Sequence, residues 1–262
     1  MNEHASPPGL SLVIPAYNEE RRLPATLAKI RRYKEGYTGE LEVIVVDDGS
    51  TDGTAALVSR EAAAMPGLHV LKRPHGGKGA AVRAGMLVAH LPQVILCDAD
   101  LSMPIEQLDR FRAVLESGID IAIGSRELPD SRRYREPVRR HIMGRIFNLL
   151  VRALIIRGLD DTQCGFKGFR RAVARDLFSY QQLDGFSFDA EVLFLAHKRG
   201  YSMQEVPIDW HFDEDSRVRP GVDTVNMTLD LLRIRYNDLR GRYRHPAHAI
   251  LARDLEAAVK DS

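Results

Sequence analysis

The sequence predicts an α/β protein built on a mostly parallel sheet with helices on both faces. Apolar runs of four to six residues recur through the first half of the 262-residue chain, and segments with helical spacing separate them. Short continuous apolar runs between helices are typical of strands buried in a parallel sheet. Four of these runs end in unusual polar segments, and a parallel sheet places its ligand crevice beyond those carboxyl ends.

Six segments are expected to form strands. LSLVI ends at Pro15, LEVIVV ends in two aspartates, VILC ends in Asp-Ala-Asp, and IDIAI ends in Gly-Ser-Arg. Their largely continuous apolar character, without strict alternation, indicates burial on both faces. The expected strands are residues 10–14, 41–46, 68–71, 94–97, 119–123 and 204–208.

Seven segments have the apolar spacing of helices. Pro24 stands where a first helical turn tolerates proline, and Asp52 or Thr54 can cap the second helix. In the last helix Met227, Leu231, Ile234 and Leu239 are roughly aligned. The expected helices are residues 25–33, a second one ending at residue 63, 79–90, 105–116, 138–157, 188–199 and 224–239.

The helix expected at residues 138–157 is amphipathic and allows two interpretations. Its apolar face carries Ile142, Ile146, Leu149, Leu150 and Ala153. Its opposite side carries His141, Arg145, Asn148 and Arg152. The pattern fits an ordinary helix that packs its apolar face on the core, or a helix that lies in a membrane interface.

Composition limits the class of protein. Hydrophobic residues make up 44% and charged residues 28% of the chain, and the net charge is +1, so nothing global indicates a nucleic-acid partner. Two cysteines, Cys97 and Cys164, indicate no disulfide framework. With no signal peptide and no apolar window of about twenty residues, we expect a cytoplasmic protein without a transmembrane segment. The expected organisation is a flexible N-terminus (1–9), one domain (10–240) and a charged tail (241–262).

Arginines are concentrated in one stretch. Seven fall within about twenty residues: Arg126, Arg132, Arg133, Arg135, Arg139, Arg140 and Arg145. Such a cluster is either solvated surface or a site for an anion such as phosphate or a lipid head group.

Asp98-Ala99-Asp100 is the sharpest chemical signal. Two carboxylates at i and i+2 after a buried strand can both reach a hard cation, and Mg²⁺ or Mn²⁺ prefers such oxygen ligands. The metal would bridge a diphosphate and neutralise its charge as it leaves. The pair Asp47 and Asp48 ends another strand, where a carboxylate can accept hydrogen bonds from a base or ribose.

A glycine-rich segment, His75-Gly76-Gly77-Lys78-Gly79, precedes a helix. Glycines let backbone approach a ligand closely, and a helix N-terminus attracts anions. The segment matches neither the Walker A spacing nor the dinucleotide fingerprint. Lys78 is therefore either a nucleotide contact or a solvated lysine.

Three ordered motifs resemble the family 2 glycosyltransferases of the GT-A fold. They are LVIPAYNE at residues 12–19, VVDDGSTDGT at 45–54 and Asp98-Ala99-Asp100, and the resemblance covers roughly residues 10–240. Further segments are similar to the dolichyl-phosphate or polyprenyl-phosphate β-glucosyltransferase branch: GSR at 124–126, DTQCGFK at 161–167, FDAE at 188–191, EVP at 205–207 and DLLRIR at 230–235. The related mannosyltransferases more often carry a serine-glycine-phenylalanine-arginine version of the segment at 162–167, so the Gln-Cys-Gly-Phe-Lys form favours glucose.

The resemblance implies roles for individual residues. The nucleotide-sugar would contact Pro15, Tyr17, Glu19, Asp47, Asp98 and Gln163. Asp48, at its strand end, and Lys78, in the glycine-rich segment, are further candidate contacts to it from their positions alone. Asp98 and Asp100 would bind the metal, with Ser102 or water where some relatives supply a glutamine. Ser125, Arg126 and Arg140 would receive the acceptor phosphate, Arg126 and Arg140 acting with the two aspartates in catalysis. Gln163 and the pair Asp189 and Glu191 would face the sugar or hold the shape of the site.

The expected function is therefore an inverting transfer of a sugar from a nucleotide-sugar, most simply glucose from UDP-glucose, to a polyprenyl or dolichyl phosphate. The expected cofactor is Mg²⁺ or Mn²⁺, and the expected location is a membrane surface reached without a transmembrane segment. Other interpretations stay open at this point. They are mannose transfer from GDP-mannose, transfer to a non-lipid acceptor, and a non-catalytic module that binds nucleotide-sugar or lipid phosphate.

Overall fold

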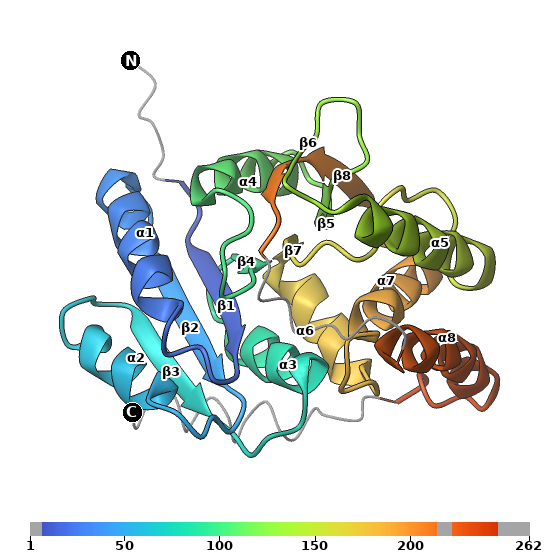
Figure 1. Cartoon of the computed structure of the whole chain (residues 1–262), viewed down its shortest axis with the longest axis horizontal. Helices are drawn as coiled ribbons and strands as arrows, with labels where there is room; N and C mark the ends of the chain where they lie inside the picture. The colour runs from blue at the N-terminus through green and yellow to red at the C-terminus, as the bar shows by residue number, and fades with distance from the viewer. Residues whose placement is uncertain (1–6, 214–221, 246–262) are drawn as a thin grey trace.

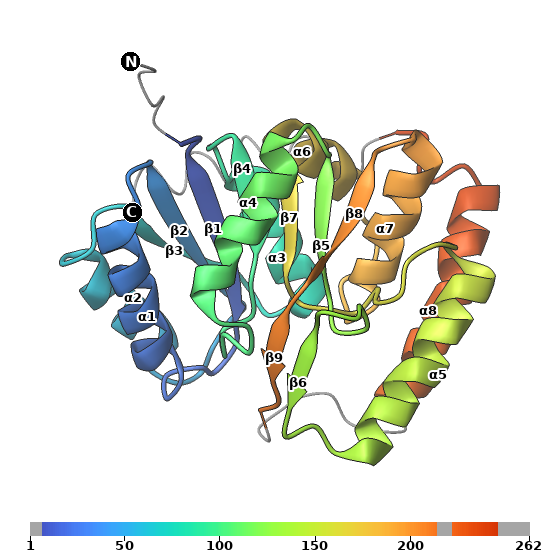
Figure 2. The same ribbon diagram turned by 90° about the horizontal axis from the view of Figure 1, so that it is seen from above.

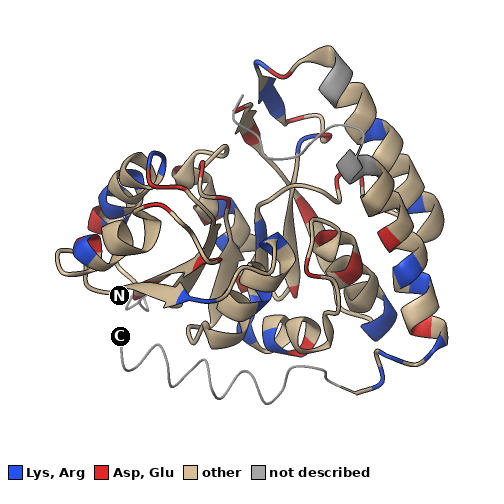
Figure 3. Cartoon of the chain, turned by 60° about the horizontal axis from the view of Figure 1, so that its bottom comes forward, with Lys and Arg blue, Asp and Glu red and all other residues tan. Residues whose placement is uncertain are grey.

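The computed structural model describes residues 7–213 and 222–245, without the side chains of residues 139, 140 and 222–224. Most of the expected flexible N-terminus and of the charged tail therefore lies outside the described residues. A seven-stranded sheet with helices on both faces forms the centre of the molecule (Figures 1 and 2), which confirms the predicted fold class. Basic and acidic residues are interspersed over the helices visible in Figure 3.

The sheet has the order β3-β2-β1-β4-β7-β5-β8. All neighbouring strands are parallel except β7, which runs antiparallel to both β4 and β5. The strands are β1 (Leu10–Ala16), β2 (Leu41–Asp47), β3 (Leu68–Lys72), β4 (Gln93–Leu96), β5 (Ile121–Ser125), β7 (Lys167–Arg170) and β8 (Met203–Pro207). A separate parallel pair joins β6 (Arg132–Tyr134) to β9 (Asp209–His211).

The helices form two layers. One face of the sheet is covered by α1 (Leu23–Gly36), α2 (Thr54–Ala62) and α4 (Leu108–Glu116), which follows a short 3-10 helix η1 (Ile105–Gln107). The other face is covered by α3 (Lys78–Val88), α6 (Arg171–Tyr180) and α7 (Phe188–Arg199), with α5 (Val138–Leu154) and α8 (Val222–Leu239) packed outside them. Leu12 and Val13 of β1 point to opposite faces, and each belongs to the apolar cluster of its own face.

The expected strands and helices are confirmed to within a few residues. Helix α6 and strands β6, β7 and β9 were not predicted. Strand β7 (KGFR) has no apolar run and is held by ladder hydrogen bonds to neighbours on both sides. Strand β5 also starts two residues later than expected and continues through Gly124 and Ser125, which were expected to follow it. Asp52 accepts the backbone N–H of Thr54, the first residue of α2.

The two outer helices correct the predicted faces. The stripe of Ile142, Ile146 and Leu149 is exposed, so its interpretation as the core-facing side of α5 is wrong. Phe147 and Val151 form the core side instead. Asn148, expected on the polar side, is buried and donates to the backbone carbonyl of Asp160.

Helix α8 shows a similar difference. Leu231 and Ile234 are buried as expected, whereas Leu239 is exposed and does not share their face. Along the described part of the chain, we find no helix with the length and apolar character needed to cross a bilayer.

Candidate active site

A cavity of about 690 Å³ lies beyond the carboxyl ends of the parallel strands. Parallel sheets bind ligands at this edge. The structure brings most of the predicted site residues to its walls: Pro15, Tyr17, Glu19, Asp48, Lys78, Asp98, Asp100, Ser102, Arg126 and Gln163. The side chain of Arg140 lies outside the described residues, although its backbone belongs to α5.

Asp47 and Ser125 are not brought to the cavity wall, in the described part of the chain. Both are buried at the ends of strands. Asp47 Oδ1 accepts the N–H of Ser50 at 3.2 Å, and Ser125 Oγ accepts the N–H of Glu127 at 3.4 Å. Their polar groups therefore shape the turns behind the wall.

Asp98 and Asp100 follow β4 on a tight turn. Asp98 Oδ1 is 2.7 Å from the Lys78 ammonium, which stands at the start of α3. Leu101 has a φ of 45°, a left-handed conformation that is uncommon for leucine, and Asp100 Oδ1 accepts the N–H of Ser102 at 2.9 Å. This turn aims both carboxylates into the cavity. Burial raises the pKa of Asp100, and the neighbouring Asp98 carboxylate raises it further.

The donor chemistry of this turn fits a hard divalent cation. Among the described residues no group of three His, Cys, Asp or Glu side chains is placed to hold a metal ion. Asp98 and Asp100 would then supply two oxygen ligands, and diphosphate oxygens and water would complete the shell, as Mg²⁺ commonly binds with substrate phosphates. Ser102 holds Asp100 through its backbone N–H.

The glycine-rich segment is fixed by Asp48. Its carboxylate forms an ion pair with Arg73 and accepts the N–H groups of Gly76 and Gly77. Gly77 has a φ of 101°, and a Cβ there would lie 2.7 Å from the carbonyl oxygen of Asp184. Asp48 therefore lines the cavity but also holds the backbone that carries Lys78 into it.

Tyr17 forms an aromatic wall beside this segment. Its ring lies 4.3 Å from the imidazole of His75, centroid to centroid, with 31° between the planes. Together with Pro15 it contributes apolar surface to the cavity, whose wall also includes Asp48. Such a surface suits the base of a nucleotide, which can stack on an aromatic ring.

A second lysine–carboxylate pair lies deeper in the site. Lys167 Nζ is 2.6 Å from Asp189 Oδ1 and also donates to the carbonyl oxygen of Cys164, and both charged groups are buried. Burial raises the pKa of Asp189, while Lys167 and Lys78 oppose that rise. Asp189 lines the cavity.

Glu191 has a different place. It is buried and accepts the N–H groups of Gln182 and Leu183 and the hydroxyl of Tyr243. Of the pair predicted from FDAE, Asp189 therefore reaches the cavity and Glu191 holds the surrounding backbone.

Arg126, another residue of the cavity wall, forms an ion pair with the buried carboxylate of Asp161. Its Nε and Nη2 donate to the two oxygens of Asp161 at 2.7 and 3.0 Å, and its guanidinium lies 5.1 Å from the ring of Trp210. Asp161 is in turn held by Glu205, which accepts its backbone N–H at 2.9 Å. Burial disfavours ionisation of Asp161, but the charge and hydrogen bonds of Arg126 outweigh it and lower the pKa to about 2.

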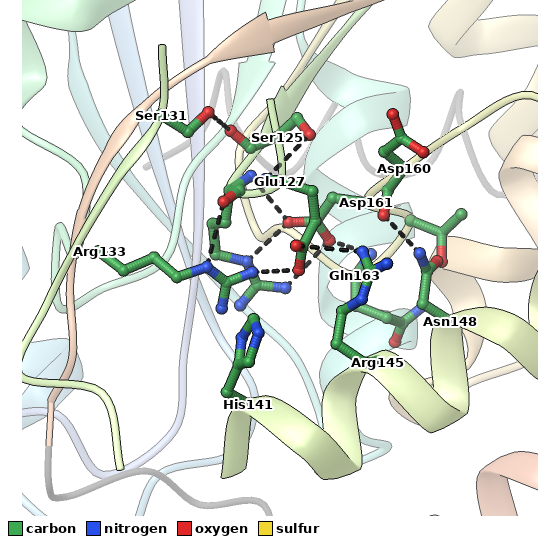
Figure 4. Close-up of polar contacts among 12 residues, drawn as sticks. Ser125, Glu127, Ser131, Arg133, His141, Arg145, Asn148, Asp160, Asp161 and Gln163 are labelled. Carbon is green, nitrogen blue, oxygen red and sulfur yellow. Dashed lines mark hydrogen bonds and ion pairs between the residues drawn. The ribbon is translucent and has the colours of Figure 1, made fainter. Parts of the chain in front are cut away.

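Arg133, His141 and Arg145 surround the same end of the cavity. Arg133 pairs with Glu127 and Glu136, Arg145 Nη1 is 3.1 Å from Glu127, and His141 Nδ1 is 3.5 Å from Glu136. Figure 4 shows His141 and Arg145 rising from α5 toward Glu127, which Arg133 reaches from β6. Arg133 and His141 line the cavity. The sequence signalled Arg133 only through the arginine cluster, and His141 only as part of the polar side of the predicted helix.

Asp161→Asn is expected to lower the free energy of unfolding by about 3 kcal/mol at pH 7, because it leaves a buried guanidinium without its counter-charge. A carboxyl whose pKa is lower in the folded than in the unfolded chain stabilises the fold above its unfolded value, here near 3.8. That contribution is lost as the pH falls toward 2. Urea denaturation between pH 7 and pH 2 measures both effects.

The exposed Asp130→Asn is the matched control for this change, with an expected effect within about 0.5 kcal/mol. The difference in the free energy of unfolding between the wild type and Asp161→Asn should become smaller below pH 4. A difference that stays constant down to pH 2 would show that Asp161 does not stabilise the fold as an ion.

Comparisons with known proteins identify the family of the chain. Residues 11–178 match the family described as Glycosyl transferase family 2. The chain is 32% identical over 249 residues to the dolichyl-phosphate β-glucosyltransferase of Dictyostelium discoideum, covering 90% of this chain and 76% of that one. It is 34% identical over 266 residues to the enzyme of the same name from Saccharomyces cerevisiae, covering 93% and 80%.

Solved structures show the same fold at lower identity. One is the glucosyl-3-phosphoglycerate synthase of Mycobacterium tuberculosis in complex with Mn²⁺, UDP-glucose and phosphoglyceric acid. The two share a TM-score of 0.63 and 20% identity, over 91% of this chain and 81% of that one. The architecture is thus that of the GT-A glycosyltransferases. With its family match and its relatives above 30% identity over most of their length, the chain belongs to the family 2 glycosyltransferases.

Proposed function

We propose that this protein transfers glucose from UDP-glucose to a dolichyl or other polyprenyl phosphate at a membrane surface, with Mg²⁺ or Mn²⁺ as cofactor. One observation carries the proposal. A single cavity joins the Asp98–Asp100 turn at one end to arginines and apolar side chains at the other. The names of the relatives supply the acceptor and the sugar, and the mycobacterial synthase, solved with UDP-glucose and Mn²⁺ bound, is a precedent for the donor and the metal.

The donor would lie along the first end. Its base would stack near Tyr17, and its diphosphate would lie between Lys78 and the two aspartates. Mg²⁺ or Mn²⁺, when bound, supplies positive charge that neutralises the departing diphosphate. Lys78 adds a further positive charge at the same place, since its ammonium already faces Asp98. Asp189 faces the same cavity from α7, where a sugar attached to the diphosphate would lie.

The acceptor would enter from the second end. A phosphate monoester has a second pKa of about 6, so at neutral pH it is already an anionic nucleophile and needs no strong general base. One of its oxygens forms a bond to the anomeric carbon as the bond from that carbon to the diphosphate oxygen breaks, with inversion. Arg126 and Arg133 would hold the phosphate in line, since guanidinium groups bind phosphate with paired hydrogen bonds. Proximity then supplies much of the rate.

Apolar side chains continue the cavity beyond these arginines. Met143 and Phe147 of α5, Trp210 of β9 and Met227 of α8 line it. A phosphate next to an apolar wall matches a ligand that is a phosphate on a hydrocarbon chain. Polar acceptors such as phosphoglyceric acid would gain nothing from this wall, which is why we favour a lipid.

The proposal is tested by product formation. The protein is incubated with Mg²⁺, a short polyprenyl phosphate and radiolabelled UDP-glucose, UDP-galactose or GDP-mannose in separate reactions, and the organic phase is counted. We expect label from UDP-glucose alone. Label from GDP-mannose instead would assign the mannosyl reaction, and no labelled lipid from any donor would reject a lipid acceptor.

Arg126→Ala is expected to raise the KM for the lipid phosphate by about 10- to 100-fold while leaving the KM for UDP-glucose within about twofold, because a hydrogen-bonded charge contributes about 1.5–3 kcal/mol. Initial-rate kinetics with each substrate varied in turn measures the split. Removing the arginine also leaves Asp161 unpaired, so the double variant Arg126→Ala/Asp161→Asn is the control. It should recover stability but not the acceptor KM, and an effect confined to the donor KM would contradict the assignment.

A further inference from the structure

Two neighbouring helices expose long apolar stripes. On α8 the exposed side chains fall three or four residues apart, which places them on one line along the helix. They are Val225, Leu229, Leu232, Tyr236 and Leu239, with exposed fractions between 49 and 86%. The buried Leu231 and Ile234 lie on the opposite side. Helix α8 is therefore apolar both toward the core and away from it.

Helix α5 repeats this pattern. Its outward stripe is Val138, Ile142, Ile146 and Leu149, between 52 and 73% exposed, opposite the buried Phe147 and Val151. Of the large apolar side chains exposed in the described part of the chain, four lie on α5, five on α8 and one, Tyr134, elsewhere. Exposed apolar surface is thus concentrated on two helices, and a concentration of this kind marks an interaction site.

The two stripes belong to one flank of the molecule. Phe147 of α5 and Leu231 of α8 belong to the same apolar cluster, and the helices pack against each other. Both lie at the β8 end of the sheet, beyond α7 (Figures 1 and 2). Because each stripe faces away from the core, the flank presents its apolar side chains to whatever lies outside it.

The charged residues next to the stripes indicate which kind of partner the flank binds. The sequence of α5, VRRHIMGRIFNLLVRAL, contains four arginines and no acidic residue. Among the side chains of α8 that the structure describes, the exposed charged ones are Arg233 and Arg235, followed by Arg240 after the helix, whereas Asp230 and Asp238 are half-buried. A second copy docked through the same face would bring one arginine-rich α5 close to another, because a two-fold interface pairs a patch with itself. An anionic lipid surface attracts these arginines and accepts the apolar stripes.

The inner sides of the same helices reach the cavity. Met143 and Phe147 of α5 and Met227 of α8 line it on the side of the acceptor arginines. A flank docked on a bilayer would hold this end of the cavity at the level of the lipid head groups. Arginine side chains beside a buried apolar stripe extend their charged groups to that level.

We propose that the outward faces of α5 and α8 form a docking surface for an anionic phospholipid membrane. The role of this surface rests on the proposed function, because a lipid phosphate would reach the cavity through it. The docking surface itself requires no substrate.

The test is sedimentation of the full chain with sucrose-loaded vesicles that contain no polyprenyl phosphate. Vesicles of phosphatidylcholine with about 30% phosphatidylglycerol are compared with pure phosphatidylcholine. We expect binding to the anionic vesicles that weakens with salt. Leu229→Gln/Leu232→Gln should reduce the partition coefficient at least about tenfold, since it removes two large apolar side chains from the stripe.

Two further variants make the result specific. Leu229→Met/Leu232→Met keeps the stripe apolar and should bind as the wild type does. Ile142→Gln/Leu149→Gln changes the stripe of α5 and should weaken binding as the α8 variant does. Equal binding of the glutamine and methionine variants, or no sedimentation of the wild type, would overturn the proposal. If the wild type is a dimer, the glutamine variants are monomers and neither binds vesicles, the proposal is also overturned. The surface would then be the interface with a second copy of the chain.

Transfer to a ten-carbon polyprenyl phosphate in detergent separates the two proposals. The glutamine variants should retain wild-type rates in this assay, because none of the changed residues lines the cavity. Vesicle binding without any transferase activity would leave the docking surface in place and reject the proposed function.

Discussion

Asp100→Asn is expected to lower the turnover number by about 10³-fold at saturating substrate, with the fold intact. A divalent cation contributes several kcal/mol to stabilising charge on a leaving group, and each 1.36 kcal/mol changes the rate tenfold. Asp100 is one of two carboxylates that enter the cavity on the turn after β4. An asparagine keeps the shape and the hydrogen bond from Ser102 but removes the charge that attracts the cation. Initial rates in millimolar Mg²⁺ or Mn²⁺ measure the loss.

The exposed Asp130→Asn serves as the control, since it removes one carboxylate outside the cavity and should leave turnover unchanged. Unfolding curves of both variants should match the wild type closely. Wild-type turnover by Asp100→Asn with metal in excess would show that this carboxylate does not act on the cation.

Gly165→Ala should lower turnover by about 10²-fold, although it adds only a methyl group. Asp98 packs directly on Gly165, and a Cβ at this position would overlap the carboxylate of Asp98. The carboxylate would have to swing away, which separates it from Lys78 and from the cavity. A displacement of about 1 Å in a positioning group can reduce a rate by about 10²-fold.

Gly36→Ala, at the end of α1, is the matched control because, apart from its chain neighbours and the adjacent backbone of α1, no atom lies within 4 Å of the added methyl. Its kinetics should be those of the wild type. For Gly165→Ala we expect weaker binding of UDP-glucose together with the lower turnover. Full activity of Gly165→Ala would mean that Asp98 acts from a position other than the one observed.

The sequence predicts best where local pattern decides the structure. The long apolar runs of β1, β2 and β4 identify the strands, and the order of a parallel sheet then brings Asp48 and Asp98 to one edge. The pleat of the strand then decides which of two adjacent residues reaches the cavity, because neighbouring side chains of a strand point to opposite sides. Asp47 and Asp48 were equivalent in the sequence, yet only Asp48 lines the cavity.

Contacts between distant segments are what the sequence leaves open. Arg126 was predicted as an anion-binding group from the arginine cluster and the resemblance, but its pairing with Asp161, 35 residues away, has no local signal. The pair between Lys167 and Asp189 likewise joins β7 to α7. In α5 the helical period was correct but the sequence left the buried side open, since apolar residues occupy both faces and only packing chooses between them.

The central claim is that Asp98 and Asp100 gather a divalent cation and a sugar-carrying diphosphate in one cavity. Equilibrium titration of UDP-glucose into the wild type and Asp100→Asn, each with and without Mn²⁺, tests it most directly. We expect Mn²⁺ to tighten binding at least about tenfold in the wild type, or about 1.4 kcal/mol, and to have little effect in Asp100→Asn. No uptake of UDP-glucose by the wild type with Mn²⁺ present, or the same Mn²⁺ dependence in both proteins, would contradict it.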